Sequence, residues 1–221
     1  MRIGSVFDKY AQDYEEWFTR NEAIYQLEVA AVQAVMPSHG LGLEVGVGTG
    51  RFAQPLGIKI GIDPASTMLR LAQARGAAVC QAFGEQLPFQ ADQFDFVLLV
   101  TVICFVKNLP LLFTEIQRVI KPGGHIIIGL IDKNSPLGKV YESQKASSKF
   151  YQAAHFYTVE EVSGFLNEIG FSELQYRQTL FADHTEADTV EQITLGYGQG
   201  SFVVVRATST KREENENTFH H

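Results

Sequence analysis

The sequence predicts an α/β fold: a mostly parallel sheet of seven strands with helices on both faces. Short apolar runs recur along the chain, segments of helical period separate most of them, and a glycine-rich turn ends the first run. The predicted strands are residues 41–46, 58–63, 77–82, 94–101, 125–131, 171–180 and 200–207. Such alternation favours parallel strands whose carboxyl ends share one edge, where this kind of sheet binds its ligands.

Size and composition favour a single domain. The chain has 221 residues, of which 45% are hydrophobic, enough for one full core. Its formal charge is −7 and its sequence pI about 5.4, without a run of basic residues interleaved with aromatics, so a nucleic-acid partner is not expected. We expect no membrane partner, since residues 1–10 lack the apolar core of a secretory signal and no apolar run has the length of a membrane span. These features predict a cytoplasmic protein.

The N-terminal segment, residues 1–36, is an addition to the sheet. It is rich in aromatic residues, among them Tyr10, Tyr14 and Trp17, and apolar residues recur at helical spacing after Asn21. We expect a helical segment packed on the sheet domain, residues 37–208, and we predict that it forms a lid over the site.

Glu44 lies near the end of the first predicted strand and is followed by Gly46, Gly48 and Gly50 at alternate positions. Glycines let a ligand approach the backbone and allow positive φ angles. A dinucleotide site has the spacing G-x-G-x-x-G, and Arg51 stands where its third glycine would be. A carboxylate just before the turn would repel a pyrophosphate but suits a ligand with an ammonium group. The loop therefore favours a nucleoside that carries an amino acid.

The second predicted strand ends in Asp63, thirteen residues after the last of these glycines. Its carboxylate is placed to accept both hydroxyls of a ribose. Because Asp63 precedes Pro64, it also suits the start of a helix, and both roles are compatible. Met68 follows one turn into that helix, where it would face either the base or the core.

Five motifs in order extend this pattern across residues 41–131. They are residues 44–50, 61–72, 85–89, 94–101 and 120–125. Together they resemble the class I S-adenosylmethionine-dependent methyltransferases, which have a Rossmann-like sheet of seven strands, usually with the last pair antiparallel. One departure is the segment between Gly50 and Ile58, where Pro55 and Gly57 leave room for only a short helix.

The resemblance implies S-adenosyl-L-methionine as the cofactor, with no metal. Glu44 and the three glycines would hold its methionine end, Asp63 its ribose, and Pro64 and Met68 would lie near its adenine. Many relatives carry an aspartate where this chain has Phe83, so adenine recognition would fall to the backbone of Gly84 and Glu85, with Phe83 stacking or packing in the core. The resemblance implies contacts from three further residues: Val100 and Thr101 at the end of the fourth strand, and Tyr14 from the lid.

A polar insertion, residues 132–157, ends in aromatic residues and lies on the predicted substrate side. His155 in this insertion is the predicted general base, if the acceptor needs one. Thr158 and Glu161 form a capping-box pattern, which predicts a helix after the insertion. Residues 209–221 are polar and charged, which predicts a disordered tail.

These inferences predict an enzyme that transfers a methyl group in line from S-adenosylmethionine to an O, N, S or C nucleophile of a small molecule. The protein would be a monomer or a homodimer. Two alternatives remain. One is a regulatory module that binds S-adenosylmethionine without turnover, and the other is an NAD-dependent dehydrogenase, which Arg51 and Glu44 disfavour.

Overall fold

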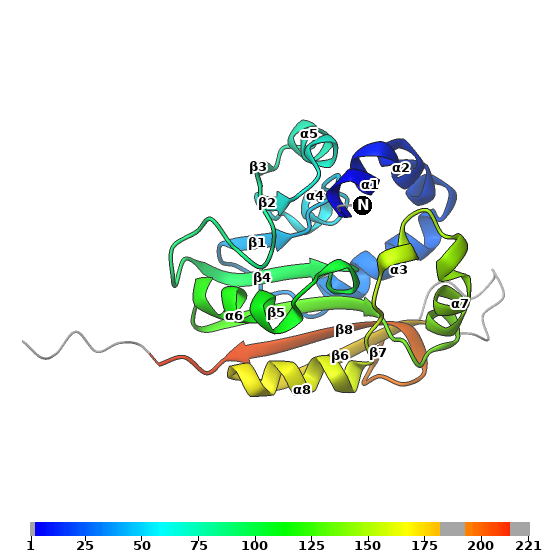
Figure 1. Cartoon of the computed structure of the whole chain (residues 1–221). Coiled ribbons are helices and arrows are strands. Elements are labelled where there is room, and N and C mark those ends of the chain that lie inside the picture. The colour runs from blue at the N-terminus through cyan, green and yellow to red at the C-terminus, as the bar shows by residue number, and fades with distance from the viewer. Residues whose placement is uncertain (1–2, 182–192, 213–221) are drawn as a thin grey trace, which may run out of the picture.

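The computed structural model describes residues 3–181 and 193–212, and its centre is one mixed sheet (Figure 1). The strand order is β3-β2-β1-β4-β5-β8-β6-β7. Strands β3 to β5 are parallel to one another, whereas β8 is antiparallel to both β5 and β6. The fold is therefore the predicted α/β type, including its antiparallel final pair.

Each predicted run contains a strand. The strands are β1 (Gly42–Val45), β2 (Ile60–Asp63), β3 (Ala78–Gln81), β4 (Phe94–Val100), β5 (Ile120–Ile131), β6 (Phe171–Phe181), β7 (Thr194–Leu195) and β8 (Gly200–Ser209). The sheet has one strand more than the predicted seven, because the two residues of β7 pair with β6. β5 begins five residues before its predicted run, since the helix before it passes directly into the strand.

Helices cover both faces of the sheet. On one face α6 (Leu109–Val119) and α8 (Val159–Ile169) pack in a core with Val97 and Leu99. On the other face α3 (Glu22–Gln33), the one-turn α4 (Ala53–Leu56) and α5 (Ser66–Ala74) pack with Leu98 and Val100. These four β4 residues alternate between the two cores because successive strand residues point to opposite faces. The short α4 agrees with the expectation for the segment after Gly50.

Two additions lie beside the carboxyl ends of the strands. The N-terminal addition contains α1 (Ile3–Lys9) and α2 (Ala11–Arg20) before α3. The insertion contains α7 (Pro136–Gln144) and two short turns, η2 (Lys145–Ser147) and η3 (Tyr151–Ala153), while η1 (Ile103–Phe105) follows β4. The capping box before α8 is present: Glu161 donates its N–H to Thr158 Oγ1, and Thr158 donates its own to Glu161 Oε2.

The predicted start of a disordered tail at Ser209 is wrong. β8 includes Ser209, which is buried, and Thr210 donates from both its backbone N–H and its hydroxyl to the carbonyl of Gly170. The remainder of that prediction, from residue 213 onward, lies outside the described residues.

Within the described ranges, no helix is long and apolar enough to cross a membrane. In the same ranges, no group of three or more His, Cys, Asp or Glu side chains is arranged to hold a metal ion.

Candidate functional site

A cavity of about 610 Å³ lies at the carboxyl ends of β1, β2 and β4. This volume falls in the range of sites that enclose small molecules and cofactors. Among the predicted site residues, those that line it are Tyr14, Gly46, Gly48, Asp63, Pro64, Met68, Phe83, Gly84, Glu85, Val100 and Thr101. The fold thus brings together residues that lie up to 87 positions apart in the chain, from Tyr14 to Thr101.

The glycine loop forms the floor of the cavity. Gly46 has φ +73° and donates its N–H to the carbonyl of Ile62 at 2.8 Å, which ties the loop to β2. Gly48 has φ +51° and faces α2, since a Cβ there would lie 3.4 Å from the Tyr14 hydroxyl. Both positions require a residue that tolerates positive φ, and a side chain at Gly48 would enter the cavity.

Asp63 stands at the tip of β2 and belongs to both the loop and the cavity. Its Oδ2 accepts from the backbone N–H of Gly48 at 3.1 Å and its Oδ1 from that of Ala65 at 2.8 Å. Each carboxylate oxygen keeps lone pairs for a further donor, such as a ribose hydroxyl. Burial, with a smaller contribution from the charge of Asp8, raises the pKa of Asp63 to about 6. The first turn of α5 is capped instead by Asp8, which accepts from Thr67 N–H at 2.7 Å.

Glu44, directly before the loop, is 2% exposed and is not among the residues that line the cavity. Its carboxylate accepts a backbone hydrogen bond from Ala53, while Oε2 has no partner among the described residues. Burial, with a smaller contribution from the charge of Asp63, raises its pKa well above the ordinary value. A buried acceptor without a donor is costly, and an ammonium group near the loop would lower that cost. The chemistry of this end of the cavity therefore fits the amino-acid portion of the predicted cofactor.

The opposite end of the cavity is mostly apolar. Met68 is 1% exposed and forms a small cluster with Ala65, whereas Phe83 is 55% exposed. Of the two predictions left open for Phe83, the exposed position favours stacking on a ligand over packing in the core. Gly84 lies where a Cβ would come within 2.5 Å of Leu112, so the chain passes close to α6 at this point.

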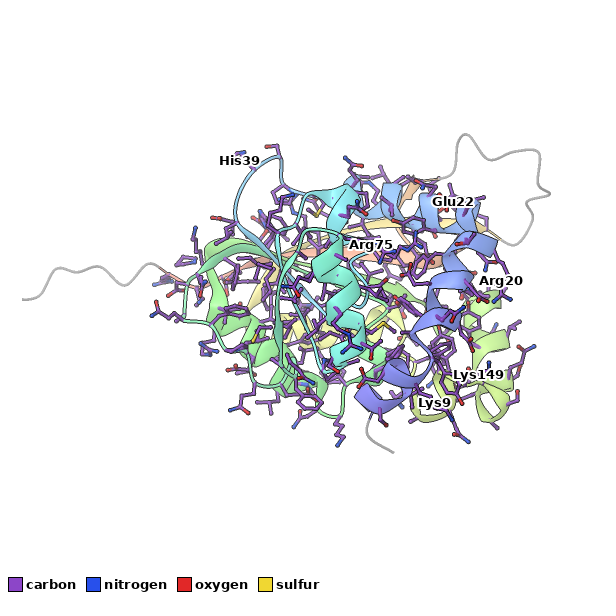
Figure 2. All side chains as sticks on the ribbon, turned by 90° about the horizontal axis from the view of Figure 1, so that it is seen from above. Lys9, Arg20, Glu22, His39, Arg75 and Lys149 are labelled. Carbon is purple, nitrogen blue, oxygen red and sulfur yellow. The ribbon has the colours of Figure 1, made fainter. Side chains whose placement is uncertain are left out.

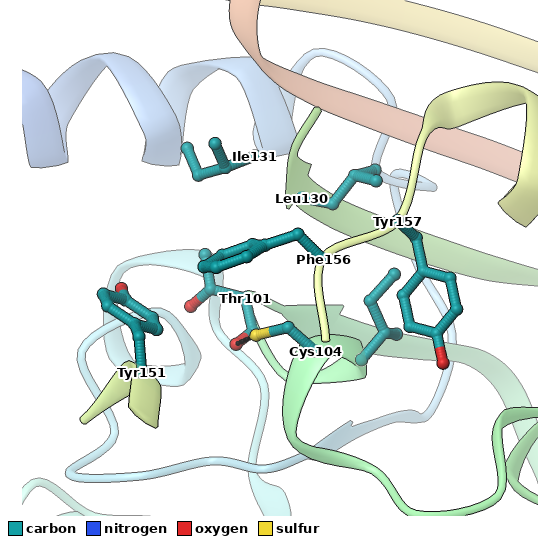
Figure 3. Close-up of a pocket in the computed structure, with 8 residues that line it drawn as sticks. Thr101, Cys104, Leu130, Ile131, Tyr151, Phe156 and Tyr157 are labelled. Atoms are coloured by element: carbon teal, nitrogen blue, oxygen red, sulfur yellow. Dashed lines mark hydrogen bonds between the residues drawn. The ribbon is translucent and has the colours of Figure 1, made fainter. Parts of the chain in front are cut away.

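A second, small cavity of about 20 Å³ adjoins the first, and Thr101 lines both (Figure 3). Figure 3 shows Thr101, Cys104, Tyr151 and Phe156 around it. Thr101 has φ +52°, a conformation that is uncommon outside glycine and is often found at functional sites. The turn that ends β4 therefore joins a cofactor-sized space to an aromatic side cavity.

An ion cluster fastens α2 to the glycine loop. Glu15 accepts from Arg51 at 2.6 Å and from Arg75 at 2.5 Å, and Arg75 also donates to the carbonyl of Thr49 at 2.7 Å. Burial opposes ionisation of Glu15, but these two guanidinium groups hold its pKa below the ordinary value. Because Thr49 and Arg51 flank Gly50, the helix that carries Tyr14 is coupled to the loop beneath it.

The insertion also reaches the N-terminal helices. The ammonium of Lys149 lies 2.5 Å from the carboxylate of Asp13, and Figure 2 shows Lys149 and Lys9 at this side of the molecule. Phe150 stacks on Phe7, with 5.4 Å between the ring centroids. Both additions therefore close over the same end of the sheet.

Besides Glu44, two predicted site residues lie outside the cavities. A Cβ on Gly50 would point toward α5 and lie 3.2 Å from Ala72 Cα. The absence of a side chain at Gly50 therefore lets the helix pack closely on the loop. His155 is exposed and lines neither cavity. Its ring packs edge-on against the ring of Tyr157, with 4.6 Å between the ring centroids. The geometry gives no support to the prediction that His155 is the general base.

Among the other residues that line the large cavity, Phe7 and Lys107 have no role predicted from the sequence. Phe7 was one of the N-terminal aromatic residues, but its direction depends on how α1 packs. The residues after Thr101 belong to a turn whose conformation no spacing rule predicts.

The Asp63→Ala variant is expected to bind S-adenosylhomocysteine at least tenfold more weakly, since the ribose hydroxyls lose their acceptor. In the wild-type protein the affinity should also fall as the pH drops below about 6, where Asp63 takes up a proton. Asp63→Asn should not show this pH dependence. Calorimetric titration measures both effects, with the exposed Asp92→Asn as the control. Wild-type affinity in Asp63→Ala would remove this residue from the ribose site.

Comparison with known proteins points to one family. A family model described as "Methyltransferase domain" matches residues 43–128. An uncharacterised protein of Methanocaldococcus jannaschii is 48% identical over 92% of this chain and 98% of its own length.

Solved structures agree with this result. A Thermotoga maritima protein described as a SAM-dependent methyltransferase, possible histamine N-methyltransferase, is 41% identical with a TM-score of 0.89, over 93% of this chain and 99% of that one. The phosphoethanolamine N-methyltransferase 2 of Haemonchus contortus, in complex with S-adenosyl-L-methionine, is 17% identical with a TM-score of 0.59. The alignment covers 84% of this chain and 53% of that one, and at this identity the likeness concerns the fold alone.

Proposed function

Because the chain belongs to the class I S-adenosylmethionine-dependent methyltransferases, we propose that it methylates a small molecule at an O, N, S or C nucleophile. The observation that carries the proposal is the pair of adjoining cavities, one cofactor-sized and one small and aromatic, that share Thr101. An acceptor space of this size suits a metabolite better than a folded macromolecule.

The chain's charge supports the same class of acceptor. The net charge of −7 is unfavourable for a polyanionic substrate such as RNA or DNA. The acids Glu44 and Asp63 lie close enough to Tyr14 to act on its hydroxyl. Burial raises the pKa of that hydroxyl most, and the charges of Asp63 and then Glu44 raise it further. With a pKa of about 6, Asp63 is ionised at neutral pH, and its negative charge favours a cationic sulfonium.

We propose that the cofactor is held by the same residues that the sequence indicates. Glu44, Gly46 and Gly48 would hold its amino-acid end, Asp63 its ribose, and Met68 with Phe83 its base. When bound, S-adenosylmethionine supplies a methyl group on a positively charged sulfur. The protein's task is then to align the acceptor with that group and to exclude water, and alignment of this kind accounts for about 7–11 kcal/mol of a barrier. The coupling of α2 to the loop by Glu15 would hold Tyr14 in place for that task.

A labelling experiment tests the function. The protein is incubated with methyl-labelled S-adenosylmethionine and, in separate reactions, with a small-metabolite extract, total RNA and unfolded protein. We expect label in the small-metabolite fraction and none above background in the other two. Label that appears only in RNA or protein would contradict a small-molecule acceptor, and failure to bind S-adenosylhomocysteine would contradict the function itself.

A further inference from the structure

The helix α5, which follows Asp63, is held at both ends by acids of the N-terminal helices. Asp8 of α1 accepts from the backbone N–H of Thr67, in the first turn of α5, at 2.7 Å. Glu15 of α2 accepts from the guanidinium of Arg75, which caps the last turn, at 2.5 Å. Figure 1 shows α1 beside α5. The contacts of these two acids therefore fix α1 and α2 to the two ends of α5.

Glu15 also reaches the glycine loop. Its carboxylate lies 2.6 Å from a guanidinium nitrogen of Arg51, which directly follows Gly50. Tyr25 of α3 holds the same loop residue by its backbone, since its hydroxyl donates to the carbonyl of Arg51 at 2.5 Å. The side chains of Glu15 and Arg51 are only 20% and 24% exposed, so water competes weakly for these charged hydrogen bonds. The loop, α5 and α2 therefore meet at one carboxylate.

Each of the two acids directly follows an aromatic residue that lines the large cavity. The pairs are Phe7–Asp8 and Tyr14–Glu15. The rings of Phe7 and Tyr14 meet edge to face, with 6.2 Å between their centroids, and both pack on the cluster that contains Met68. Neither acid lines either cavity. In each pair the aromatic side chain therefore covers the cavity, while the acid beside it holds the helix in place.

The position of Tyr14 sets the space above the glycine loop. A Cβ on Gly48 would lie only 3.4 Å from the Tyr14 hydroxyl. Apolar packing is non-directional and would let α2 slide on its neighbours, whereas hydrogen bonds between charged groups have narrow preferred distances and angles. The contacts of Glu15 therefore fix the distance from Tyr14 to the loop.

We propose that Asp8 and Glu15 are positioning residues for the cofactor, because they fix Phe7 and Tyr14 over the cavity that binds it. The inference rests on the proposed function, since it concerns the same cofactor. Each acid would act through the aromatic residue before it, without touching the cofactor. Cofactor binding and the docking of α1 and α2 on α5 are then linked, and each strengthens the other.

Calorimetric titration with S-adenosylhomocysteine tests the proposal in a double-mutant cycle. Glu15→Gln keeps the size of the side chain and removes its charge, and we expect it to weaken binding at least about fivefold. In a Tyr14→Leu background the same change should weaken binding by less than about twofold, because the side chain that Glu15 positions is no longer there. The control Glu16→Gln, which removes an exposed acid that pairs with Arg20 in the same helix, should bind as the wild type does.

A second cycle tests the other end of α5. Asp8→Ala removes the acceptor of the Thr67 N–H and should weaken binding at least about threefold, whereas in a Phe7→Leu background it should have little further effect. Urea unfolding of the same variants separates this role from a structural one. Lost stability alone lowers the midpoint of unfolding and leaves the affinity of the folded protein unchanged.

Each other outcome has one meaning. Wild-type affinity in Glu15→Gln or in Asp8→Ala overturns the inference and leaves the methyltransferase function standing. An effect of Glu15→Gln that keeps its full size in the Tyr14→Leu background also overturns it, because the acid would then act on the cofactor by its charge alone. Absence of S-adenosylhomocysteine binding in the wild-type protein would overturn both the proposed function and this inference.

Discussion

Raising the pH from 5 to 8 will destabilise the wild-type protein by up to about 4 kcal/mol more than the Glu28→Gln variant. Burial raises the pKa of Glu28 from its ordinary 4.5 to about 8. Between these values the unfolded chain has released the proton that the folded protein still holds. The contribution of protonated Glu28 to the free energy of unfolding is therefore complete below pH 4.5. It is lost as the pH rises toward 8, at about 1.4 kcal/mol per pH unit.

Urea unfolding at pH 5, 6, 7 and 8 measures this slope. Glu44 also has a raised pKa, but it contributes equally to the wild type and the variant, so the difference between their curves isolates Glu28. The tyrosines on which the charge of Glu28 acts have raised pKa values and stay protonated throughout. The control Glu142→Gln, which removes an exposed acid, should run parallel to the wild type. If Glu28→Gln also runs parallel to it, Glu28 ionises normally and its burial has no energetic consequence.

Gly46→Ala will destabilise the protein by about 2–5 kcal/mol and weaken cofactor binding more than tenfold. A left-handed backbone at a residue with a Cβ costs about 1–2 kcal/mol, and here φ is +73°. The new Cβ would also lie 2.3 Å from Val102 Cγ2, and such overpacking costs about 1–3 kcal/mol. Because Val102 lines the cavity, its displacement would disturb the site itself.

Gly57 provides a matched control for this prediction. Its φ is +72°, and a Cβ there would meet nothing within 4 Å. Gly57→Ala should therefore show the backbone cost alone, without an effect on S-adenosylhomocysteine affinity. Equal losses of stability and affinity in the two variants would mean that Val102 does not restrict the loop.

The strands and the cofactor loop could be predicted from sequence because both depend on local patterns. Apolar runs that are buried on both faces are continuous, so β1, β2 and β4 stand out. The glycines and Asp63 have fixed positions relative to strand ends, which is why the fold brings most predicted site residues to one cavity. The antiparallel direction of β6 and β8 was expected from the resemblance alone, since no pattern within either run specifies the direction of its neighbour.

The remaining features depend on contacts between distant segments. Glu15 meets Arg51 and Arg75 only after α2 has packed against the loop and α5, so no spacing in the sequence indicates this cluster. Glu28 gave one weak signal, an acid three residues after Tyr25 in an otherwise apolar helix face. His155 was selected for its residue type and its aromatic neighbours, but the backbone of the insertion turns it outward.

The position of β8 between β5 and β6 also bears on how the chain acquires its structure during synthesis. β6 emerges from the ribosome before either strand with which it pairs, because β7 and β8 both follow it. Until β8 is made, the nascent chain presents two open strand edges, and such edges invite pairing with other chains. β8 alone pairs with both of these edges. During synthesis, β5 and β6 are therefore protected from pairing with other chains only once residues 200–209 have been made and have added to the sheet.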